Sequence, residues 1–410
     1  MAHTYIDTLF EVYPNRTEYL DWIQYELDTR VYYFGNHFKT PFGHKRQLKY
    51  RIRNYLASFK RKVSNIDFDG AILSEAYANW GINDKLKEEG YKVCMLPWHA
   101  DPGFRLSTEY AAVANGLDYG DFNFLLSEYF IDRVYNFRSF LQCNHIKLVI
   151  FANDMTAINR IAISACKNVG VKSMIYLHGL PAGSYNAIDN NRADYLCVWG
   201  DRMKELCVNA GVNANKVIVM GNAKYSGQKF PDTHPASFDN VLVLSRAISG
   251  APSDSVKRPI ENRGLSIDYI YMVEEALKRV GVNKATLRLH PSENGEWYKK
   301  FIDSDFYTLD DKSLMDCLSD KTAIVSPAST VMFDAFLCGI PFFAFEPHTI
   351  IGYEVVPPFD GSEEEMPIAK SISELVDHLQ HNIVASHALI DKYINPVVDM
   401  SKIKELLPNG

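Results

Sequence analysis

Residues 323–345 read AIVSPASTVMFDAFLCGIPFFAF, and this stretch decides the fold class. The short apolar run Ala323–Val325 predicts a buried strand, and the small polar residues after it lead into an apolar helix over Val331–Leu337. Gly339 ends the helix, and Pro341–Phe345 predicts the next buried strand. A strand, a helix and a second strand in this order are typical of a parallel sheet covered by helices.

The same alternation of short apolar runs with segments of helical period recurs along the chain and indicates an α/β protein. The further predicted strands are Ala71–Leu73, Lys92–Leu96, Leu148–Phe151, Ser173–Leu177, Tyr195–Val198, Val217–Met220, Val241–Leu244 and Ala285–Leu289. Residues 223–240 are polar, contain two prolines and show no periodicity, so we interpret them as a linker. We therefore expect two Rossmann-type α/β domains, residues 1–230 and 231–410, with parallel sheets that face a central cleft.

Composition limits the classes of function. The chain has 410 residues, of which 47% are hydrophobic and 23% charged, as in a globular protein long enough for two domains. Its net charge of -7 argues against a nucleic-acid partner. The seven cysteines form no CxxC pair, so we expect a reducing compartment and no structural zinc. Because the chain has neither a leader pattern nor a run of about 18 apolar residues, we expect a cytoplasmic protein.

One segment departs from the acidic balance. Residues 43–65, GHKRQLKYRIRNYLASFKRKVSN, carry eight Lys or Arg and no carboxylate. Apolar residues at helical spacing, from Leu48 to Val63, predict a helix with one apolar and one cationic face. Such a helix would make a peripheral contact with the anionic inner face of the cytoplasmic membrane, or with an anionic acceptor. A packed helix with a solvated basic face is the alternative.

The first candidate for chemistry follows a strand of the second half, where ATLRLHP ends in His290-Pro291. Because the proline prevents a helix from starting at once, we expect the imidazole at the carboxyl end of the strand. Arg288 lies two residues earlier and therefore on the same side of the strand. An imidazole and a guanidinium suit a phosphate or a sugar-acid carboxylate. A histidine that only caps the strand is the alternative.

The second candidate is the turn Ser326-Pro327-Ala328-Ser329-Thr330 at the start of the predicted helix. Free backbone N–H groups at a helix start, together with the hydroxyls of Ser326, Ser329 and Thr330, would cradle a phosphate. N-capping by Ser329 or Thr330 is the alternative. Glu346, just past the following strand, is a candidate acceptor for ribose hydroxyls, unless it is a surface carboxylate.

Together the two motifs resemble those of a known family. RLHP at residues 288–291 and SPASTVMFDAFLCGIP at residues 326–341 look like the HP and Ser/Thr motifs of bacterial GT-B glycosyltransferases that use CMP-activated sugars. This group includes sialyltransferases, polysialyltransferases and Kdo-transferases of capsule and lipopolysaccharide, and a related pattern occurs in CDP-glycerol transferases. Residues 193–225 are similar to the passage between the domains of these enzymes. The resemblance implies that His290 contacts the donor phosphate, and that Ser326, Ser329 and Thr330 contact the phosphate or the sugar carboxylate.

Two acids of the first half are candidates for the general base that deprotonates an acceptor hydroxyl. Asp154 follows the predicted strand Leu148–Phe151, and Glu75 follows the strand Ala71–Leu73. A helix N-cap is the alternative for Asp154. The sialyltransferases carry an acidic pair before a glycine in this half, which Asp67-Phe68-Asp69-Gly70 matches loosely. Because these acids precede their strand, we expect them to point away from the cleft and rank them below Asp154.

Other polar side chains also follow predicted strands. His178 is a candidate for positioning the acceptor or the donor, with a structural loop histidine as the alternative. Arg246 is a candidate for holding the sugar-acid carboxylate, with a surface arginine as the alternative. Asp232 and Asp254 would matter if the mechanism used a covalent carboxylate nucleophile.

We therefore expect a metal-independent glycosyltransferase without a cofactor. It would transfer Kdo or a sialic acid from its CMP ester to a bacterial surface polysaccharide or lipopolysaccharide, with the acceptor on the first domain and the donor on the second. A CMP-sugar carries a single phosphate, which His290 and the Ser326–Thr330 turn could stabilise without a metal, while Arg246 and Arg288 balance the donor charge. Two alternatives remain open: a polyol-phosphate transferase that uses a CDP-glycerol-type donor, and a non-catalytic glycan- or nucleotide-binding component of a polysaccharide assembly complex.

Overall fold

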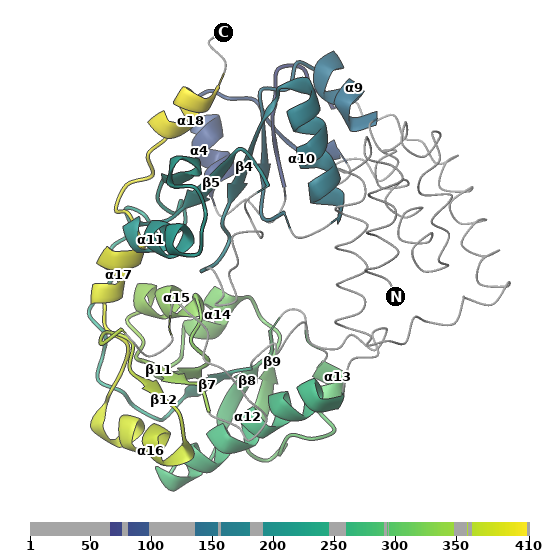
Figure 1. The fold of residues 1–410 in the computed structure, drawn as a ribbon. Helices are drawn as coiled ribbons and strands as arrows, with labels where there is room; N and C mark the ends of the chain where they lie inside the picture. Colours follow the sequence, from purple (N-terminus) through teal and green to yellow (C-terminus); the bar gives the residue numbers. More distant parts are fainter. Residues whose placement is uncertain are drawn as a thin grey trace, which may run out of the picture. The chain divides into compact units, whose positions relative to one another are not determined.

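The computed structural model describes residues 66–75, 81–97, 136–154, 157–180, 192–245, 260–290, 293, 295–347, 359 and 363–407. These residues form two compact units, each built on a six-stranded parallel sheet with helices on both faces (Figure 1). Of the described residues, the first unit contains 66–178, 192–224 and 397–407, and the second contains 179–180 and 225–396. The predicted α/β class with two Rossmann-type domains is confirmed.

The sheet of the first unit has the strand order β2-β1-β3-β4-β5-β6. Its strands are β1 (Ile72–Ser74), β2 (Val93–Met95), β3 (Leu148–Phe151), β4 (Lys172–Tyr176), β5 (Tyr195–Val198) and β6 (Val217–Val219). Its helices are α4 (Ile82–Glu88), α9 (Asn136–Cys143), α10 (Ala157–Val169), α11 (Asp201–Asn209) and α18 (Ser401–Leu406), with the 3-10 turn η3 (Ala214–Lys216) before β6. Alternate strand residues such as Ile72 and Ile150 pack with Ile82 and Leu86 of α4 and Ile403 of α18, while α10 lies against β4 on the other face (Figure 1).

The sheet of the second unit has the order β12-β11-β10-β7-β8-β9, which is the 6-5-4-1-2-3 order of a Rossmann fold when its strands are counted from β7. The strands are β7 (Val241–Leu244), β8 (Ala285–Arg288), β9 (Tyr307–Asp310), β10 (Ala323–Ser326), β11 (Phe342–Phe345) and β12 (Ile368–Ala369). The helices are α12 (Ile260–Arg279), α13 (Gly295–Tyr298), α14 (Leu314–Leu318), α15 (Val331–Leu337), α16 (Ile372–His381) and α17 (Ala388–Tyr393). Figure 1 shows α12 and α16 on one side of the strands and α14 and α15 on the other.

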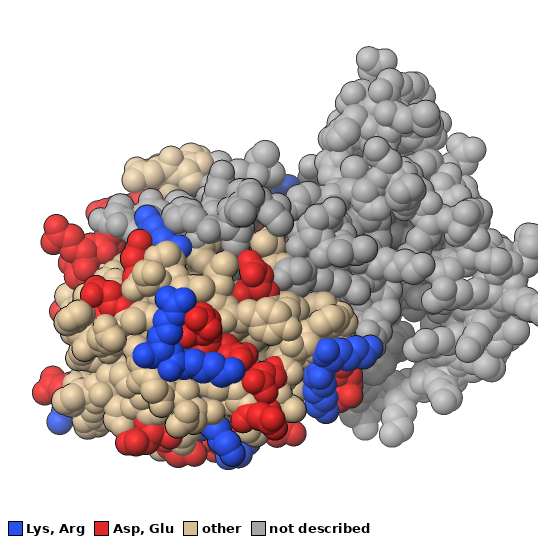
Figure 2. Space-filling view, turned by 90° about the horizontal axis from the view of Figure 1, so that it is seen from below, with Lys and Arg blue, Asp and Glu red and all other residues tan. Residues whose placement is uncertain are grey.

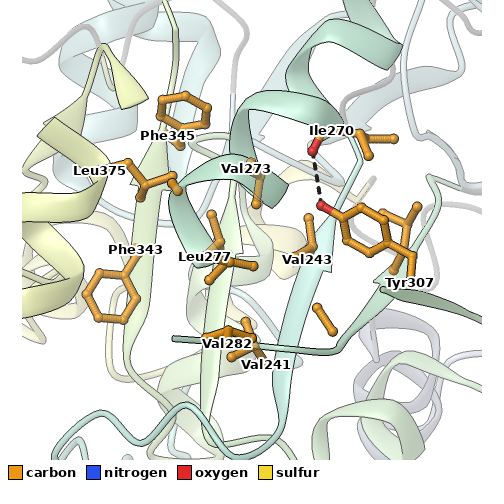
Figure 3. Packing of buried hydrophobic residues seen from close by; sticks show 14 of the residues in the cluster. Val241, Val243, Ile270, Val273, Leu277, Val282, Tyr307, Phe343, Phe345 and Leu375 are labelled. Carbon is orange, nitrogen blue, oxygen red and sulfur yellow. Dashed lines mark hydrogen bonds between the residues drawn. The ribbon is translucent and has the colours of Figure 1, made fainter. Parts of the chain in front are cut away.

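The core of the second unit fixes which face of its sheet each helix covers. Val243 and Phe343 come from the sheet and pack against Leu277 of α12 and Leu375 of α16, all of them completely buried (Figure 3). At the edge of this cluster the Tyr307 hydroxyl donates to the Ile270 carbonyl at 3.0 Å. Each fully buried aliphatic side chain of this kind contributes about 1.5–3 kcal/mol to folding. This packing holds the described strands of the second sheet together.

Every predicted strand is present, with ends that differ by no more than two residues, and the helix predicted over Val331–Leu337 is α15. The boundaries of the compact units differ from the single boundary after residue 230 that the linker predicted. The compact units separate between Lys224 and Tyr225, and residues 397–407 belong to the first unit rather than the second. This C-terminal segment is held on the first unit by the fully buried Ile403 and by the Asp399 N–H, which donates to the Met220 carbonyl at 2.9 Å.

The predictions on membrane contact and on the cysteines concern features outside the two sheets. Among the described helices, none has the combination of length and hydropathy that a bilayer-crossing segment needs. The basic segment 43–65, on which the membrane contact was predicted, lies outside the described residues. All seven cysteines lie within them and are free thiols.

Replacing Ile403 tests the return of the C-terminal segment to the first unit. Ile403→Ala is expected to lower the free energy of unfolding by about 2–5 kcal/mol, because it leaves a cavity where α18 packs on the sheet. Urea denaturation followed by circular dichroism measures the change. Glu405→Ala, at an exposed position of the same helix, is the control and should change stability by less than about 0.5 kcal/mol. Equal, small changes for both variants would contradict the packing of α18.

Candidate functional site

The strand order of the second unit identifies the edge at which a ligand would bind. β7 and β10 are neighbours, but the chain continues from β7 toward β8 and β9, and from β10 toward β11 and β12. Open α/β sheets bind ligands at such a switch point, outside the carboxyl ends of the strands. Ser245 directly follows β7, His290 lies two residues beyond the end of β8, and the Ser326–Thr330 turn begins at the last residue of β10. The fold therefore brings the two sequence motifs to the same edge of one sheet.

A hydrogen-bond network holds the backbone at His290. The His290 N–H donates to Ser245 Oγ at 2.9 Å and to Glu293 Oε2 at 2.8 Å. The hydroxyls of Ser245 and Tyr298 both donate to the Glu293 carboxylate. Burial and then the charge of Glu293 raise the pKa of the Tyr298 hydroxyl well above its usual value, so it stays a donor at every physiological pH. The side chain of His290 itself is exposed, as a residue that meets a ligand must be.

Arg288 is held by the neighbouring strand. One of its guanidinium nitrogens lies 2.6 Å from Asp310 Oδ2 of β9 and donates to the Lys312 carbonyl at 2.7 Å. The two side chains are 19% and 7% exposed, so the pair is largely screened from water. These contacts explain the position of Arg288 without a ligand, and its role toward a donor stays a prediction.

The Ser326–Thr330 turn is partly committed to internal hydrogen bonds. Ser326 is 1% exposed and its hydroxyl donates to the Pro327 carbonyl at 2.8 Å. The Ala328 N–H donates to Glu346 Oε1 at 3.0 Å. Thr330 occupies the N-cap position of α15, but its hydroxyl makes no capping hydrogen bond there. The groups left for a ligand are therefore at the Ser329 and Thr330 end of the turn, and the N-capping alternative does not describe Thr330.

Glu346 is not a surface carboxylate. It is 3% exposed, its N–H donates to the Ala369 carbonyl at 2.9 Å, and its side chain accepts the hydrogen bond from Ala328. The carboxylate thus ties the turn after β10 to the end of β11. Its contact with ribose hydroxyls stays a prediction.

In the first unit, Glu75 lies at the corresponding switch point, between β1 and β3. It is 7% exposed, and its Oε2 accepts hydrogen bonds from the Ala152 N–H at 2.8 Å and from Asn159 Nδ2 at 3.1 Å. His178, an exposed residue after β4, has its Nδ1 3.2 Å from the carbonyl oxygen of the same Ala152. The fold therefore brings Glu75 and His178 together on either side of one peptide segment, at the carboxyl edge of the first sheet.

Asp154 is placed differently from Glu75. Its side chain is completely buried. Its Oδ2 accepts a hydrogen bond from the Arg192 N–H at 2.8 Å, and its Oδ1 lies 3.4 Å from the Arg192 guanidinium. A carboxylate enclosed in this way has no access to an acceptor hydroxyl in the described conformation. The first-ranked candidate base is thus less well placed than the second.

The acidic pair that loosely matched the sialyltransferase motif lies where the sequence placed it, before β1. Asp67 is exposed and pairs with Lys92 at 2.5 Å, and a hydrogen bond from this lysine lowers the pKa of the aspartate. Asp69 pairs with His145 at 2.7 Å. Within the described part of the chain, no three His, Cys, Asp or Glu side chains are grouped so as to hold a metal ion.

Some candidates cannot be placed, and some residues of the site were missed. Arg246 and Asp254 lie outside the described residues, whereas Asp232 lies among the linker residues at the start of the second unit. The sequence did not single out Ser245, Glu293 and Tyr298 in the second unit, or Asn159 and Arg192 in the first. A usable signal existed for Ser245, which directly follows a predicted strand.

Charge on the surface is mixed rather than gathered. Figure 2 shows Lys and Arg side chains beside Asp and Glu side chains on the face that it presents. On α12, oppositely charged side chains form ion pairs, Lys278 with Glu274 at 2.6 Å and Arg279 with Glu275 at 3.0 Å. This face carries no single basic field of the kind that collects the phosphates of nucleic acids.

No protein-family model and no curated protein matches the chain. Solved structures do resemble it. A glycosyltransferase from Rickettsia africae ESF-5 is 12% identical, with a TM-score of 0.49, and the match covers 83% of this chain and 100% of that one. The apo form of the lipopolysaccharide outer core galactosyltransferase WaaB is 13% identical, with a TM-score of 0.45 and coverage of 82% and 96%. UDP-GlcNAc 2-epimerase from Neisseria meningitidis, bound to UDP-GlcNAc, is 12% identical, with a TM-score of 0.44 and coverage of 82% and 97%.

Likenesses this distant bear on the fold alone. The architecture rests on the chain's own topology, in which two successive Rossmann-like domains each carry a six-stranded parallel sheet. Two such domains in succession are the components of the GT-B architecture that the sequence predicted.

The ion pair between Arg288 and Asp310 is expected to stabilise the second unit. Asp310→Asn should lower the free energy of unfolding by about 1–3 kcal/mol, because it removes the charged partner of a largely buried guanidinium. Urea denaturation measures the change. Glu275→Gln, which removes the acid of an exposed pair on α12, is the matched control and should cost less than about 1 kcal/mol. If Asp310→Asn had no larger effect than the control, the stabilising role of this ion pair would be contradicted.

Proposed function

We propose that this protein is a glycosyltransferase that binds a nucleotide-sugar donor on its second unit and a glycan acceptor on its first. One observation carries the proposal: His290 and the Ser326–Thr330 turn follow β8 and β10, at the carboxyl edge that contains the switch point between β7 and β10. Side-chain and backbone groups that can donate hydrogen bonds to a phosphate therefore lie at the edge where open α/β sheets bind nucleotides.

The donor we propose is a CMP-activated acidic sugar, Kdo or a sialic acid. The HP and Ser/Thr motifs support this choice, and so do the groups that the described residues of the site offer. The exposed His290 and the Ser329 and Thr330 end of the turn are enough to contact a single phosphate. Stabilisation of the leaving phosphate by such donors requires neither a metal nor another cofactor. Arg246 would hold the carboxylate of the sugar.

The acceptor we propose is a bacterial surface polysaccharide or lipopolysaccharide, deprotonated by Glu75. Glu75 is favoured over Asp154, because Asp154 is completely buried and paired with Arg192. Glu75 is held by Ala152 and Asn159 through one oxygen, Oε2, which leaves the other oxygen to accept a proton. His178, across Ala152 from Glu75, would then position the acceptor.

Nucleotide binding tests the proposed donor site. In calorimetric titrations without added metal, CMP is expected to bind more tightly than CDP, UDP or GDP. His290→Ala should weaken CMP binding about tenfold or more, since a hydrogen bond to a charged phosphate contributes about 1.5–3 kcal/mol. His381→Ala, which removes an exposed histidine from α16, is the control and should bind CMP as the unmodified protein does.

Each other outcome of the titrations has a definite meaning. Tighter binding of CDP would favour a CDP-glycerol-type polyol-phosphate transferase, and tighter binding of UDP or GDP would move the donor to another class of sugar. Absence of binding by every nucleotide would contradict the proposed function.

Transfer assays distinguish the two candidate bases. With CMP-Kdo or CMP-sialic acid as donor and lipopolysaccharide or capsular oligosaccharide as acceptor, Glu75→Gln should lower kcat by about 10²–10⁴-fold, because it removes the general base. Its CMP affinity should not change. Asp154→Asn should instead reduce stability and leave kcat within about tenfold at temperatures where the variant is folded. Retained activity in Glu75→Gln together with its loss in folded Asp154→Asn would reverse the assignment.

A further inference from the structure

Glu293 occupies a position in the candidate site that neither motif contains. Its carboxylate accepts hydrogen bonds from three separate segments: the Ser245 hydroxyl after β7, the His290 N–H after β8 and the Tyr298 hydroxyl in α13. Tyr298 is completely buried and Ser245 is 9% exposed, so two of the three donors are shielded from water, while Glu293 itself is half-buried. Hydrogen bonds to a carboxylate are about twice as strong as those between neutral groups.

The network acts on the backbone of His290 from two sides. Ser245 Oγ accepts the His290 N–H at 2.9 Å while its own hydrogen is donated to Glu293. The Ser245 N–H donates in turn to the Arg288 carbonyl at 3.0 Å, which is part of the ladder between β7 and β8. The peptide that carries the exposed imidazole is thereby tied to the ends of two central strands.

We propose that Glu293 is the positioning residue of the donor site. Its carboxylate fixes the backbone of His290 between the ends of β7 and β8, so that the imidazole is already ordered when the donor phosphate arrives. Glu293 itself does not touch the donor and acts through His290. This inference rests on the proposed function, because it takes His290 as the ligand of the donor phosphate. Ordering a loop before binding raises affinity by removing the entropy that binding would otherwise lose.

The first test measures CMP affinity by calorimetry. Glu293→Ala is expected to weaken binding about tenfold or more, since all three donors lose their shared acceptor. Glu293→Gln should recover part of this loss, because its amide oxygen still accepts from the His290 N–H. Glu296→Gln changes the exposed partner of Lys299 in α13, which follows Glu293, and is the matched control, with unchanged affinity. Unchanged affinity in Glu293→Ala would overturn the proposal.

A double-variant cycle separates positioning from a general structural role. If Glu293 acts through His290, the variant His290→Ala/Glu293→Ala binds CMP no more weakly than His290→Ala alone. Losses that simply add would mean that Glu293 contacts the nucleotide itself or only supports the fold, and would overturn the positioning role.

A measurement without ligand keeps this inference distinct from the proposed function. If the unmodified protein bound none of the nucleotides, the proposed function would fail, but the hold of Glu293 on His290 could still be judged by hydrogen exchange. Peptides that span residues 287–298 should exchange at least tenfold faster in Glu293→Ala than in the unmodified protein, with partial recovery in Glu293→Gln. Peptides from β10 and β11 should be unchanged. Equal exchange across residues 287–298 in all variants would overturn the inference.

Discussion

The candidate site depends on one constraint, the uniform hand of the connections between parallel strands. From β7 the chain passes through α12 on one face of the second sheet to β8, and from β10 it passes through α15 on the other face to β11 (Figure 1). Where the connections from two neighbouring strands leave toward opposite faces, open α/β sheets bind ligands at the carboxyl edge between them. The first sheet repeats this arrangement at β1 and β3, so each described sheet has a switch point between two neighbouring strands.

Carboxylates that are buried (Glu75, Glu346) or half-buried (Glu293) fix the backbone at both of these edges. Glu75 accepts from the Ala152 N–H, Glu293 from the His290 N–H and Glu346 from the Ala328 N–H. In the second unit, Glu293 joins the ends of β7 and β8 to α13, and Glu346 joins the turn after β10 to the end of β11. Burying a carboxylate is costly unless hydrogen bonds compensate for the lost water, and here the compensating donors belong to the site itself. The energy of these bonds therefore goes into ordering the loops that would meet substrates.

More of the fold than of the candidate site could be predicted from the sequence. Strands buried on both faces are continuous apolar runs, so they were predicted to within two residues. Two strands were missed: in β9 (Tyr307–Asp310) apolar and polar residues alternate at the sheet edge, and β12 (Ile368–Ala369) is too short to form a run. His290 and Ser326 were found because they directly follow strands. Glu293 was missed, because its contact with Ser245 joins residues 48 positions apart, and the burial of Asp154 likewise depends on Arg192, 38 positions away.

The central claim is that the donor nucleotide binds at the carboxyl edge of the second sheet, between the loops that follow β7, β8 and β10. An experimental structure of the protein with CMP bound tests it most directly. The account predicts the phosphate within hydrogen-bond distance of His290 and of the Ser329 and Thr330 end of the turn, with Glu293 beneath His290 and not touching the nucleotide. CMP bound on the first unit, or at the amino edge of the second sheet, would contradict it.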